Sequence, residues 1–405
     1  MTEHKNTPEL RFPEFKEEWK FQKLGNLAQF SKGKSLSKKD LNINGNPCIL
    51  YGELYTKYGA ILNKVYSKTS TQNDSLVFSK RNQILIPSSG ETDIDIATAT
   101  AIDTDVKIAI GGDLNIITPI NSDGRFISLY INGKGKYNLA KYAQGKSVVH
   151  LYNSDIKKLN FYLPTNMVEQ KKIGNFFSKL DRQIELEEEK LELLEQQKRG
   201  YIQKFFSQEL RFKDANGNSY PDWSIKKIED ISKVNKGFTP NTKNDEYWDE
   251  LNENWLSIAG MTQKYLYKGN KGITKKGASK HAKVDKDTLI MSFKLTLGKL
   301  AIVKEPIYTN EAICHFVWKE SNVNTVYMYY YLNSINISTF GAQAVKGVTL
   351  NNDSINSIIV KLPVIQEQNK IAYFFNKLDK LIEKQSSKVE LLKQRKQGLL
   401  QKMFV

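Results

Sequence analysis

The sequence predicts an α+β protein formed by internal duplication. We expect two α/β domains and two long helices, the helices pairing as an antiparallel coiled coil about a pseudo-twofold axis. The segment 169–206 matches the segment 367–404 without a gap at 21 of 38 positions, which indicates a duplicated unit. Both segments carry a heptad pattern, and the regions before them share motifs at their edges. The expected boundaries are 1–165, 166–208, 209–364 and 365–405.

Each domain is expected to begin with the same tryptophan motif. The spacing from Trp19 to Gly33 is repeated from Trp223 to Gly237, and both pairs are related by an offset of 204 residues. The loop 216–220 lies in an insertion of the second copy. The shared spacing indicates that the two domains start with equivalent elements.

The interiors of the two domains are less alike. The segments 46–52 and 255–260 are expected to be equivalent strands, and so are the segments 83–87 and 288–293. A helix is expected over 326–333. Short β-branched and aromatic runs between Gly- and Asn-rich turns predict a mixed sheet in each domain.

Each domain is expected to end at a Leu-Pro pair directly before a long helix. The pairs are Leu163-Pro164 and Leu362-Pro363. Proline is favoured before or within the first turn of a helix and is excluded from central strands. The sheet regions should therefore end there.

The heptad pattern predicts which residues form the buried contact line between the two helices, the coiled-coil seam. In the first helix its apolar positions are Ile173, Phe177, Leu180, Ile184, Leu191, Leu194 and Tyr201. In the second helix they are Ile371, Phe375, Leu378, Ile382, Val389, Leu392 and Leu399.

The coiled-coil seam is interrupted at equivalent places in the two copies. The polar interruptions are Glu187/Gln385 and Lys198/Lys396. Polar seam residues weaken pairing but fix register and partner. Gly200 and Gly398 also coincide, although glycine costs about 1 kcal/mol inside a helix. A closely approaching partner helix would explain both glycines.

The lengths of the elements favour antiparallel pairing. A helix of 38 residues is about 57 Å long, and a domain of this size is about 40 Å across. Parallel pairing would require the second domain to carry the chain back along the whole helix. Antiparallel pairing needs no such span. It places the domains at opposite ends of the helix pair and returns Val405 towards the first domain.

Composition favours a polyanionic partner. The chain has 405 residues, 40% of them hydrophobic, and a formal net charge of +16, which fits a folded protein that binds nucleic acid. Cys48 and Cys314 cannot form a disulfide framework, and no signal peptide or membrane-spanning run is found. We expect a soluble, cytoplasmic protein with no membrane partner.

Catalytic and metal-binding motifs are not recognised. Asn46-Pro47-Cys48-Ile49 lacks the second proline and the stacking aromatic residue of an amino-methyltransferase motif. Gly145-Lys146-Ser147 lacks the earlier glycine of a phosphate loop. The four histidines show no metal-ligand spacing. We expect no catalytic residues, no metal site and no cofactor in this chain. Two alternatives remain open, a stand-alone DNA-modifying enzyme with an unrecognised site and a coiled-coil adaptor that does not bind DNA.

Basic loops supply the candidate DNA-binding residues. They occupy matching positions at 31–39 and 233–244, precede the closing strand at 144–147 and 346–349, and extend over 264–283. Lysines beside Gly, Ser and Thr can reach phosphate oxygens. The candidates are Lys32, Lys34, Lys38, Lys146, Ser147, Lys236, Lys264, Tyr265, Lys268, Lys271, Lys275, Lys276 and Lys346. The acidic segment 91–105 is expected to face away from DNA.

The repeated motifs resemble those of the specificity subunit of type I restriction–modification systems. The most specific are Leu-Pro…Glu-Gln-x-x-Ile…Phe-Phe…Leu-Asp…Ile-Glu at 163–185 and 362–383, and Trp…Gly at 19–33 and 223–237. The resemblance implies two target recognition domains, each reading one half of a bipartite, asymmetric double-stranded DNA site. It also implies that the helices dock two modification subunits, which methylate adenine N6 with S-adenosylmethionine. Restriction subunits would add ATP- and Mg²⁺-dependent translocation and cleavage.

Overall fold

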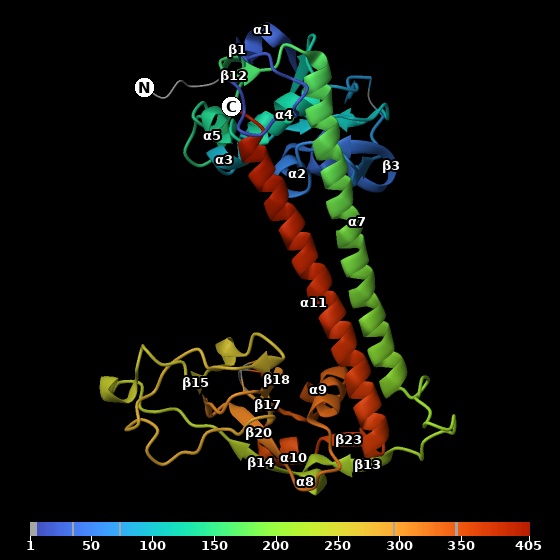
Figure 1. Cartoon of the computed structure of the whole chain (residues 1–405), viewed down its shortest axis with the longest axis vertical. Coiled ribbons are helices and arrows are strands. Elements are labelled where there is room, and N and C mark those ends of the chain that lie inside the picture. The colour runs from blue at the N-terminus through green and yellow to red at the C-terminus, as the bar shows by residue number, and fades with distance from the viewer. Residues whose placement is uncertain (1–5, 35, 73, 295, 345–346) are drawn as a thin grey trace. The chain divides into compact units, whose positions relative to one another are not determined.

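The computed structural model describes residues 6–34, 36–72, 74–294, 296–344 and 347–405. The chain forms two compact units. Unit 1 contains Met1–Lys190 and Gln385–Val405, and unit 2 contains Leu191–Lys384. Each unit therefore holds one sheet domain and part of both long helices, α7 (Met167–Phe206) and α11 (Ile365–Lys402) (Figure 1). Within the described ranges, no helix combines the length and the apolar character needed to cross a membrane.

Unit 1 combines short strands with short helices. The strands are β1 (Lys20–Lys23), β2 (Ala28–Lys32), β3 (Leu41–Ile49), β4 (Ser67–Thr69), β5 (Val77–Phe78), β6 (Ile84–Pro87), β7 (Ser89–Gly90), β8 (Thr100–Ala101), β9 (Ala109–Ile110), β10 (Leu114–Pro119), β11 (Val149–His150) and β12 (Asn160–Leu163). The helices before α7 are α1 (Leu24–Leu27), α2 (Tyr51–Thr56), α3 (Asp93–Ile96), α4 (Gly124–Asn132), α5 (Lys136–Ala140) and α6 (Asn153–Ile156). The central sheet is antiparallel, with strand order β2-β10-β6-β8.

Unit 2 repeats this plan with a larger sheet. Its strands are β13 (Ser224–Lys227), β14 (Ser232–Lys236), β15 (Trp255–Leu256), β16 (Tyr265–Leu266), β17 (Leu289–Ser292), β18 (Leu300–Val303), β19 (Tyr308–Thr309), β20 (Ile313–Trp318), β21 (Ala342–Ala344), β22 (Gly347–Thr349) and β23 (Ile359–Leu362). Its short helices are α8 (Ile228–Ile231), α9 (Thr325–Ser334) and α10 (Asn352–Asn356). The central sheet has the order β14-β20-β17-β18-β16, in which β16 and β18 are parallel.

Strand pairing confirms that the two domains share one framework. The closing pair β1–β12 corresponds to β13–β23, and β2-β10-β6 corresponds to β14-β20-β17. The predicted equivalence of 83–87 and 288–293 is confirmed, because β6 and β17 hold the same place in these sheets. The predicted equivalence of 46–52 and 255–260 is confirmed as well. The end of β3 pairs in parallel with β9, and β15 pairs in parallel with β19.

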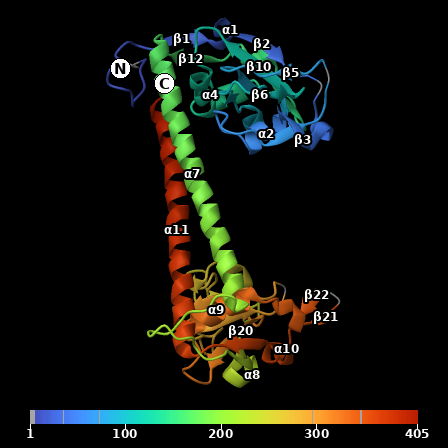
Figure 2. The same ribbon diagram turned by 90° about the vertical axis from the view of Figure 1, so that its right-hand side faces the viewer.

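One helix of each domain lies between its sheet and the long helices. Figure 2 shows α4 in this position in unit 1. Phe126 of α4 is fully buried in a cluster that includes Ile86 of β6 and Phe177 of α7. In unit 2, Tyr327 of α9 occupies the same kind of cluster between β17 and α11. These layers attach each sheet firmly to its part of the long helices.

The long helices pair in opposite directions in both units, as predicted. In unit 1, Asp181 and Glu187 of α7 form ion pairs with Lys396 and Lys388 of α11, so the residue numbers run oppositely. In unit 2, Lys198 contacts Asp379 at 2.6 Å, and the rings of Phe205 and Phe374 lie 5.4 Å apart. The polar seam residues therefore have specific partners. Gln385 Nε2 donates to Glu187 Oε2 at 2.7 Å.

The coiled-coil seam is largely as predicted. Its apolar members are buried or half-buried, except that Tyr201 is 37% exposed and packs edge-on against Phe374. The explanation offered for the two glycines is wrong. A Cβ added at Gly200 or Gly398 would meet nothing within 4 Å, so no described neighbour approaches closely there.

The C-terminal end of α11 packs on unit 1, as the antiparallel prediction requires. Phe404 is fully buried, and its ring lies 5.0 Å from that of Phe126 and 6.3 Å from that of Trp19. Figure 1 shows the red end of α11 beside α4.

Candidate nucleic-acid interface

A buried glutamate anchors the start of each domain to the helix that follows it. Glu169 is 1% exposed and accepts two hydrogen bonds from the Arg11 guanidinium, at 2.7 and 2.8 Å. It also accepts one from Trp19 Nε1 at 3.1 Å. The same three roles are filled in unit 2 by Glu367, Arg211 and Trp223. The most specific repeated residues are thus internal contacts that position the rest of the domain.

The glutamine that follows each glutamate holds α4 or α9. Gln170 Oε1 accepts from the backbone N–H of Asp123, the N-cap of α4, at 2.9 Å. Its amide donates to Pro164 O at 2.8 Å. Gln368 makes the equivalent bonds to Asn324 and Pro363. The Leu-Pro and Glu-Gln motifs therefore act together.

In unit 1, two of the predicted basic loops lie next to each other. Lys32 Nζ, at the end of β2, is 5.8 Å from the centre of the Tyr152 ring, which stacks on His150. His150 pairs through its backbone with Gln144, at the start of the second loop. The predicted residues of these loops are all exposed: Lys32, Lys34, Lys38, Lys146 and Ser147. We call Lys32, Lys34, Lys146, Ser147 and Tyr152 the unit 1 basic face.

Unit 2 has the equivalent arrangement at the end of β14. Lys236 holds the position of Lys32 and lies 4.7 Å from the centre of the Phe293 ring. The backbone N–H of Leu350 donates to Phe293 O, so the loop before α10 reaches this place. Lys346 lies outside the described residues.

The later part of the segment 264–283 packs against the chain that follows Lys236. Phe238, two residues after Lys236, stacks on His281 with ring centres 3.6 Å apart. Lys271 Nζ is 5.8 Å from the Trp248 ring centre, within the same aromatic cluster. Lys268, Lys271, Lys275 and Lys276 are exposed. Lys268 and Lys276 form ion pairs with Glu253 and Glu246 at the surface. Such exposed pairs are weak, and phosphate can replace them.

Lys264 and Tyr265 lie apart from the other predicted residues of unit 2, and their polar groups make contacts within the unit. The Lys264 side chain is 12% exposed, and its amine lies 3.1 Å from Asp379 of α11. Burial lowers the pKa of Lys264 to about 8, although the negative charge of Asp379 acts to raise it. The Tyr265 hydroxyl donates to Asn376 Oδ1 at 3.0 Å. Both residues lie at β16, the sheet edge opposite β14.

The sequence did not identify Tyr152 and His150 as members of the basic surface. Both rings lie between the predicted loops and are partly exposed, Tyr152 at 43%. Aromatic rings beside lysines are suited to stacking on bases. The available signal was the run Val148–Tyr152, which follows Lys146 and Ser147 directly.

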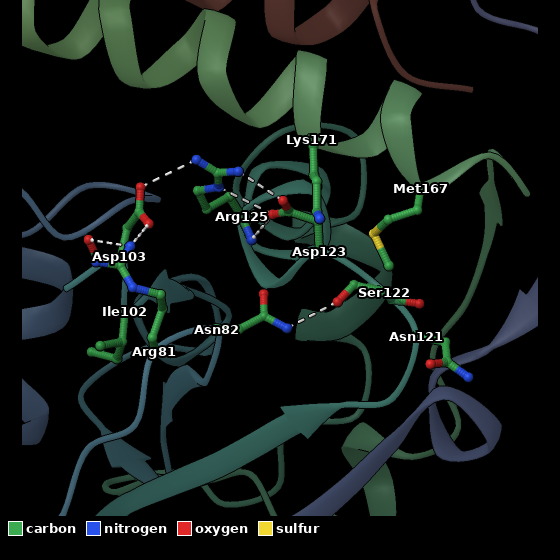
Figure 3. A pocket seen from close by; sticks show the side chains of 10 residues that line it. All are labelled: Arg81, Asn82, Ile102, Asp103, Asn121, Ser122, Asp123, Arg125, Met167 and Lys171. Carbon is green, nitrogen blue, oxygen red and sulfur yellow. Dashed lines mark hydrogen bonds and ion pairs between the residues drawn. The ribbon is translucent and has the colours of Figure 1, made fainter. Parts of the chain in front are cut away.

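A second charged region of unit 1 is internally neutralised. A pocket of about 430 Å³ is bordered by Arg81, Arg125 and Lys171. Figure 3 shows both guanidinium groups directed at carboxylates rather than into open space. Arg81 pairs with Asp103 at 2.7 Å, and Arg125 pairs with Asp123 at 2.8 Å. The carboxyl groups hold the pKa of Arg125 above its usual value, mainly through the hydrogen bonds to Asp123. This region stabilises the contact of α4 with α7.

No group of three or more His, Cys, Asp or Glu residues suited to hold a metal ion occurs within the described ranges. The candidate interface consists of exposed lysines, hydroxyls and aromatic rings around the ends of β2 and β14. Such groups bind phosphates and stack on bases.

The chain is similar to type I restriction enzyme specificity subunits of Methanocaldococcus jannaschii. It is 29% identical to the MjaIX specificity subunit over 209 residues, which cover 49% of this chain and 48% of the relative. It is 22% identical to the MjaVIII specificity subunit over 427 aligned positions, covering 96% and 93%. The chain thus spans about half of the first relative and nearly all of the second.

Solved structures share the fold. A type I restriction–modification S subunit from M. genitalium superposes with a TM-score of 0.61 at 16% identity, over 98% of this chain and 99% of that one. A chain from a study of complex assembly and conformational transition of the type I R-M system gives 0.57 at 12% identity, over 95% and 97%.

The family model described as the type I restriction modification DNA specificity domain matches residues 16–196 and again residues 220–392. These findings favour DNA recognition over the stand-alone enzyme and the adaptor without DNA binding. The chain belongs to the type I restriction–modification DNA specificity family, and its function is DNA sequence recognition rather than catalysis.

Proposed function

We propose that this chain reads a bipartite, asymmetric DNA target, with one half-site bound by each domain. The main observation that supports this proposal is that one strand framework occurs twice and presents different loops at equivalent places. A shared framework gives both domains the same way of approaching a duplex. Different loops give each domain its own base preference, because base-edge contacts carry sequence information.

We assign the recognition domains to residues 1–165 and 209–364, and the connecting helices to 166–208 and 365–405. The exposed lysines near β2 and β14 would contact phosphates, which fix register without reading sequence. Lys264 and Tyr265 do not belong to this proposed interface, because their side chains contact Asp379 and Asn376 of α11 within unit 2.

The helices are proposed to hold two modification subunits, with restriction subunits joining the same complex. Both would supply the catalysis and cofactors that this chain is not expected to provide. Two buried free thiols, Cys48 and Cys314, fit the reducing cytoplasm as the compartment.

The main experiment is sequencing of methylated bases in cells that carry this chain with its modification subunit. The expected result is a methylated motif with two unlike halves separated by unspecified base pairs. A continuous or palindromic motif would contradict the proposal.

The basic face is tested with the purified complex and that DNA. Lys32→Gln, Lys34→Gln and Lys146→Gln together should weaken binding for specific and unrelated sequences alike. The slope of log K against log salt should become shallower by about 0.9 for each DNA phosphate that these lysines neutralise in the wild type.

The matched control neutralises three exposed lysines elsewhere in unit 1, Lys107, Lys134 and Lys141. This control should leave the salt slope unchanged. Equal effects of both triple variants would show that only net charge matters and that the basic face is not the interface.

A further inference from the structure

Unit 2 contains a lysine whose ammonium group is enclosed by polar and aromatic side chains. The ammonium of Lys264 lies 2.6 Å from Asn376 Oδ1 and 3.1 Å from Asp379 Oδ2, and it contacts the Tyr330 hydroxyl. It is 4.1 Å from the centre of the Tyr330 ring and 5.0 Å from that of Tyr265. The other oxygen of Asp379 pairs with Lys198. The half-buried Asp379 carboxylate thus contacts two lysines and the Tyr330 hydroxyl. We call Lys264, Tyr330, Asn376 and Asp379 the ammonium cage.

Backbone hydrogen bonds identify the residue of unit 1 that holds the place of Lys264. The N–H of Ile302, in β18, donates to Lys264 O at 2.7 Å. The N–H of Ala101, in β8, donates to Ala60 O at 2.8 Å. Because β18 and β8 occupy equivalent places in the two sheets, Ala60 corresponds to Lys264.

The other members of the ammonium cage correspond in the same way. Leu129 and Tyr330 each lie six residues after the N-cap of α4 or α9, so leucine replaces the tyrosine. The ungapped helix repeat, with an offset of 198, matches Asp379 with Asp181 and Asn376 with Ser178. Unit 1 thus keeps the acceptors and lacks the ammonium and the hydroxyl.

One oxygen of Asp181 and the Ser178 hydroxyl are left without partners. Asp181 Oδ1 pairs with Lys396, as Asp379 Oδ1 pairs with Lys198. Asp181 Oδ2 and Ser178 Oγ are buried and make no hydrogen bond within the part of the chain that the structure describes, and the Asp181 side chain is only 10% exposed. Leaving such groups unpaired is costly, so a missing partner is indicated.

A cavity beside Asp181 offers space for this partner. A cavity of about 500 Å³ opens between α2, the loop after it and the two long helices of unit 1. The residues that border it include Tyr55, Tyr66, Asp181, Glu185 and Glu188. Three lysines border it too, and each already pairs with a carboxylate: Lys57 with Glu53, Lys393 with Glu188 and Lys396 with Asp181 Oδ1. Tyrosine rings and carboxylates are the groups that surround bound ammonium ions.

The protonation behaviour of the two aspartates agrees with this comparison. Burial raises the pKa of Asp181, and Lys396 only partly opposes it. Burial acts on Asp379 too, but hydrogen bonds from Lys198 and Tyr330 and the charge of Lys264 lower its pKa below the usual value. The carboxylate of unit 1 therefore lacks the stabilisation that its counterpart receives.

We propose that this cavity binds a primary ammonium group from outside the chain, at the place that Lys264 Nζ takes in unit 2. An ammonium supplies the several N–H donors that Asp181 Oδ2 and Ser178 Oγ require. Two sources carry this chemistry, a lysine side chain of a protein partner and a free polyamine. The inference does not depend on the proposed DNA target.

The first experiment titrates the full chain with spermidine and with methylammonium at constant ionic strength, by calorimetry and thermal shift. Binding is expected for the wild type and at least tenfold weaker for Asp181→Asn. Tetramethylammonium, which has no N–H donor, should not bind. An equal response to tetramethylammonium, or to potassium, would overturn the assignment.

A second variant does not remove the buried ion pair. Ala60→Lys restores in unit 1 the lysine of unit 2 and should fill the cavity from within. It is expected to raise the melting temperature and to abolish amine binding. Unchanged amine binding in this variant would overturn the proposal, even if Asp181→Asn failed to fold.

The two sources are separated in the complex with the modification subunit. If assembly blocks amine binding, or if small amines never bind but Ala60→Lys weakens assembly at least tenfold, the ammonium is a partner lysine. If amines bind the complex as well as the free chain, the occupant is a polyamine. If no amine binds and assembly is indifferent to both variants, the site is not an ammonium site. DNA affinity, measured separately, reports on the proposed function alone.

Discussion

At the scale of single residues, the buried glutamates are the most exacting feature of each unit. Glu169 pairs with the guanidinium of Arg11, whose side chain is only 12% exposed, and accepts a hydrogen bond from the indole N–H of Trp19. Removing one member of a buried pair leaves the other charged and unpaired, which costs more than the pair itself contributes.

Glu169→Ala is therefore expected to lower the free energy of unfolding by about 3 kcal/mol. Arg11 and Trp19 would both lose their acceptor. Glu189→Ala, on an exposed part of the same helix, should change stability by less than about 0.5 kcal/mol. Urea unfolding of both variants checks the difference. Similar stability for the two would mean that the anchor is dispensable.

His315 gives the chain a defined response to acid. Burial lowers the pKa of its imidazole to about 4 from an ordinary value of 6.5. The unfolded chain then binds more protons than the folded one between these values, so stability falls as pH falls. The expected loss from pH 6.5 to 4 is about 3 kcal/mol. His315→Gln should flatten that part of the pH profile of urea unfolding, while His281→Gln, at an exposed ring, should not.

The role of a residue could be predicted from the sequence only where the residue belongs to a motif that occurs in both copies with the same spacing. The Trp and Glu-Gln motifs stood out by repetition. Arg11 and Arg211 did not, because the second copy has four more residues between arginine and tryptophan (223−211 is 12, and 19−11 is 8). Lys264 looked like a loop lysine because its partner Asp379 is 115 residues away.

At the scale of elements, the helices were predictable and the sheets only in part. Heptad spacing is local, so α7 and α11 could be predicted from the sequence together with the residues of their seam. The match of β8 with β18 could not, because strands of two and four residues have no periodic signal and their pairing is non-local. The framework became visible only through strand order.

The two glycines of the long helices supply a test at this scale. Since a Cβ at Gly200 or Gly398 meets open space, Gly→Ala at either position should stabilise by about 1 kcal/mol through helix propensity alone. At Gly174 the added Cβ would lie 3.0 Å from Arg125 Nε, so Gly174→Ala should gain less. Thermal and urea unfolding measure all three. Destabilisation by Gly200→Ala would show that a partner does approach this position.

At the scale of the whole molecule, duplication followed by divergence explains why the two units share their framework but differ in their loops. The residues shared by both units, such as Glu169 and Glu367, are buried and make internal contacts. Many of the residues that differ lie in exposed loops on a common frame, although Ala60 and Leu129 replace Lys264 and Tyr330 in the interior. A frame held constant by buried motifs allows the loops to change without loss of folding, which suits a protein whose function is to distinguish DNA sequences.

The long helices connect the two proposed recognition domains, and the last prediction is that they also set the distance between the two half-sites. Deleting Glu187–Lys190 from α7 together with the equivalent Gln385–Lys388 from α11 removes about one turn from each partner. This shortens the pair by about 6 Å and rotates its ends by about 40°. Because the deletions match, the antiparallel contacts on either side can still form. The gap between half-sites should shrink by about two base pairs at about 3.4 Å each, as read from the methylated motif. Deleting the turn from α7 alone should instead disrupt pairing and binding. An unchanged gap with the double deletion would mean that the helices do not set the distance between the two bound half-sites.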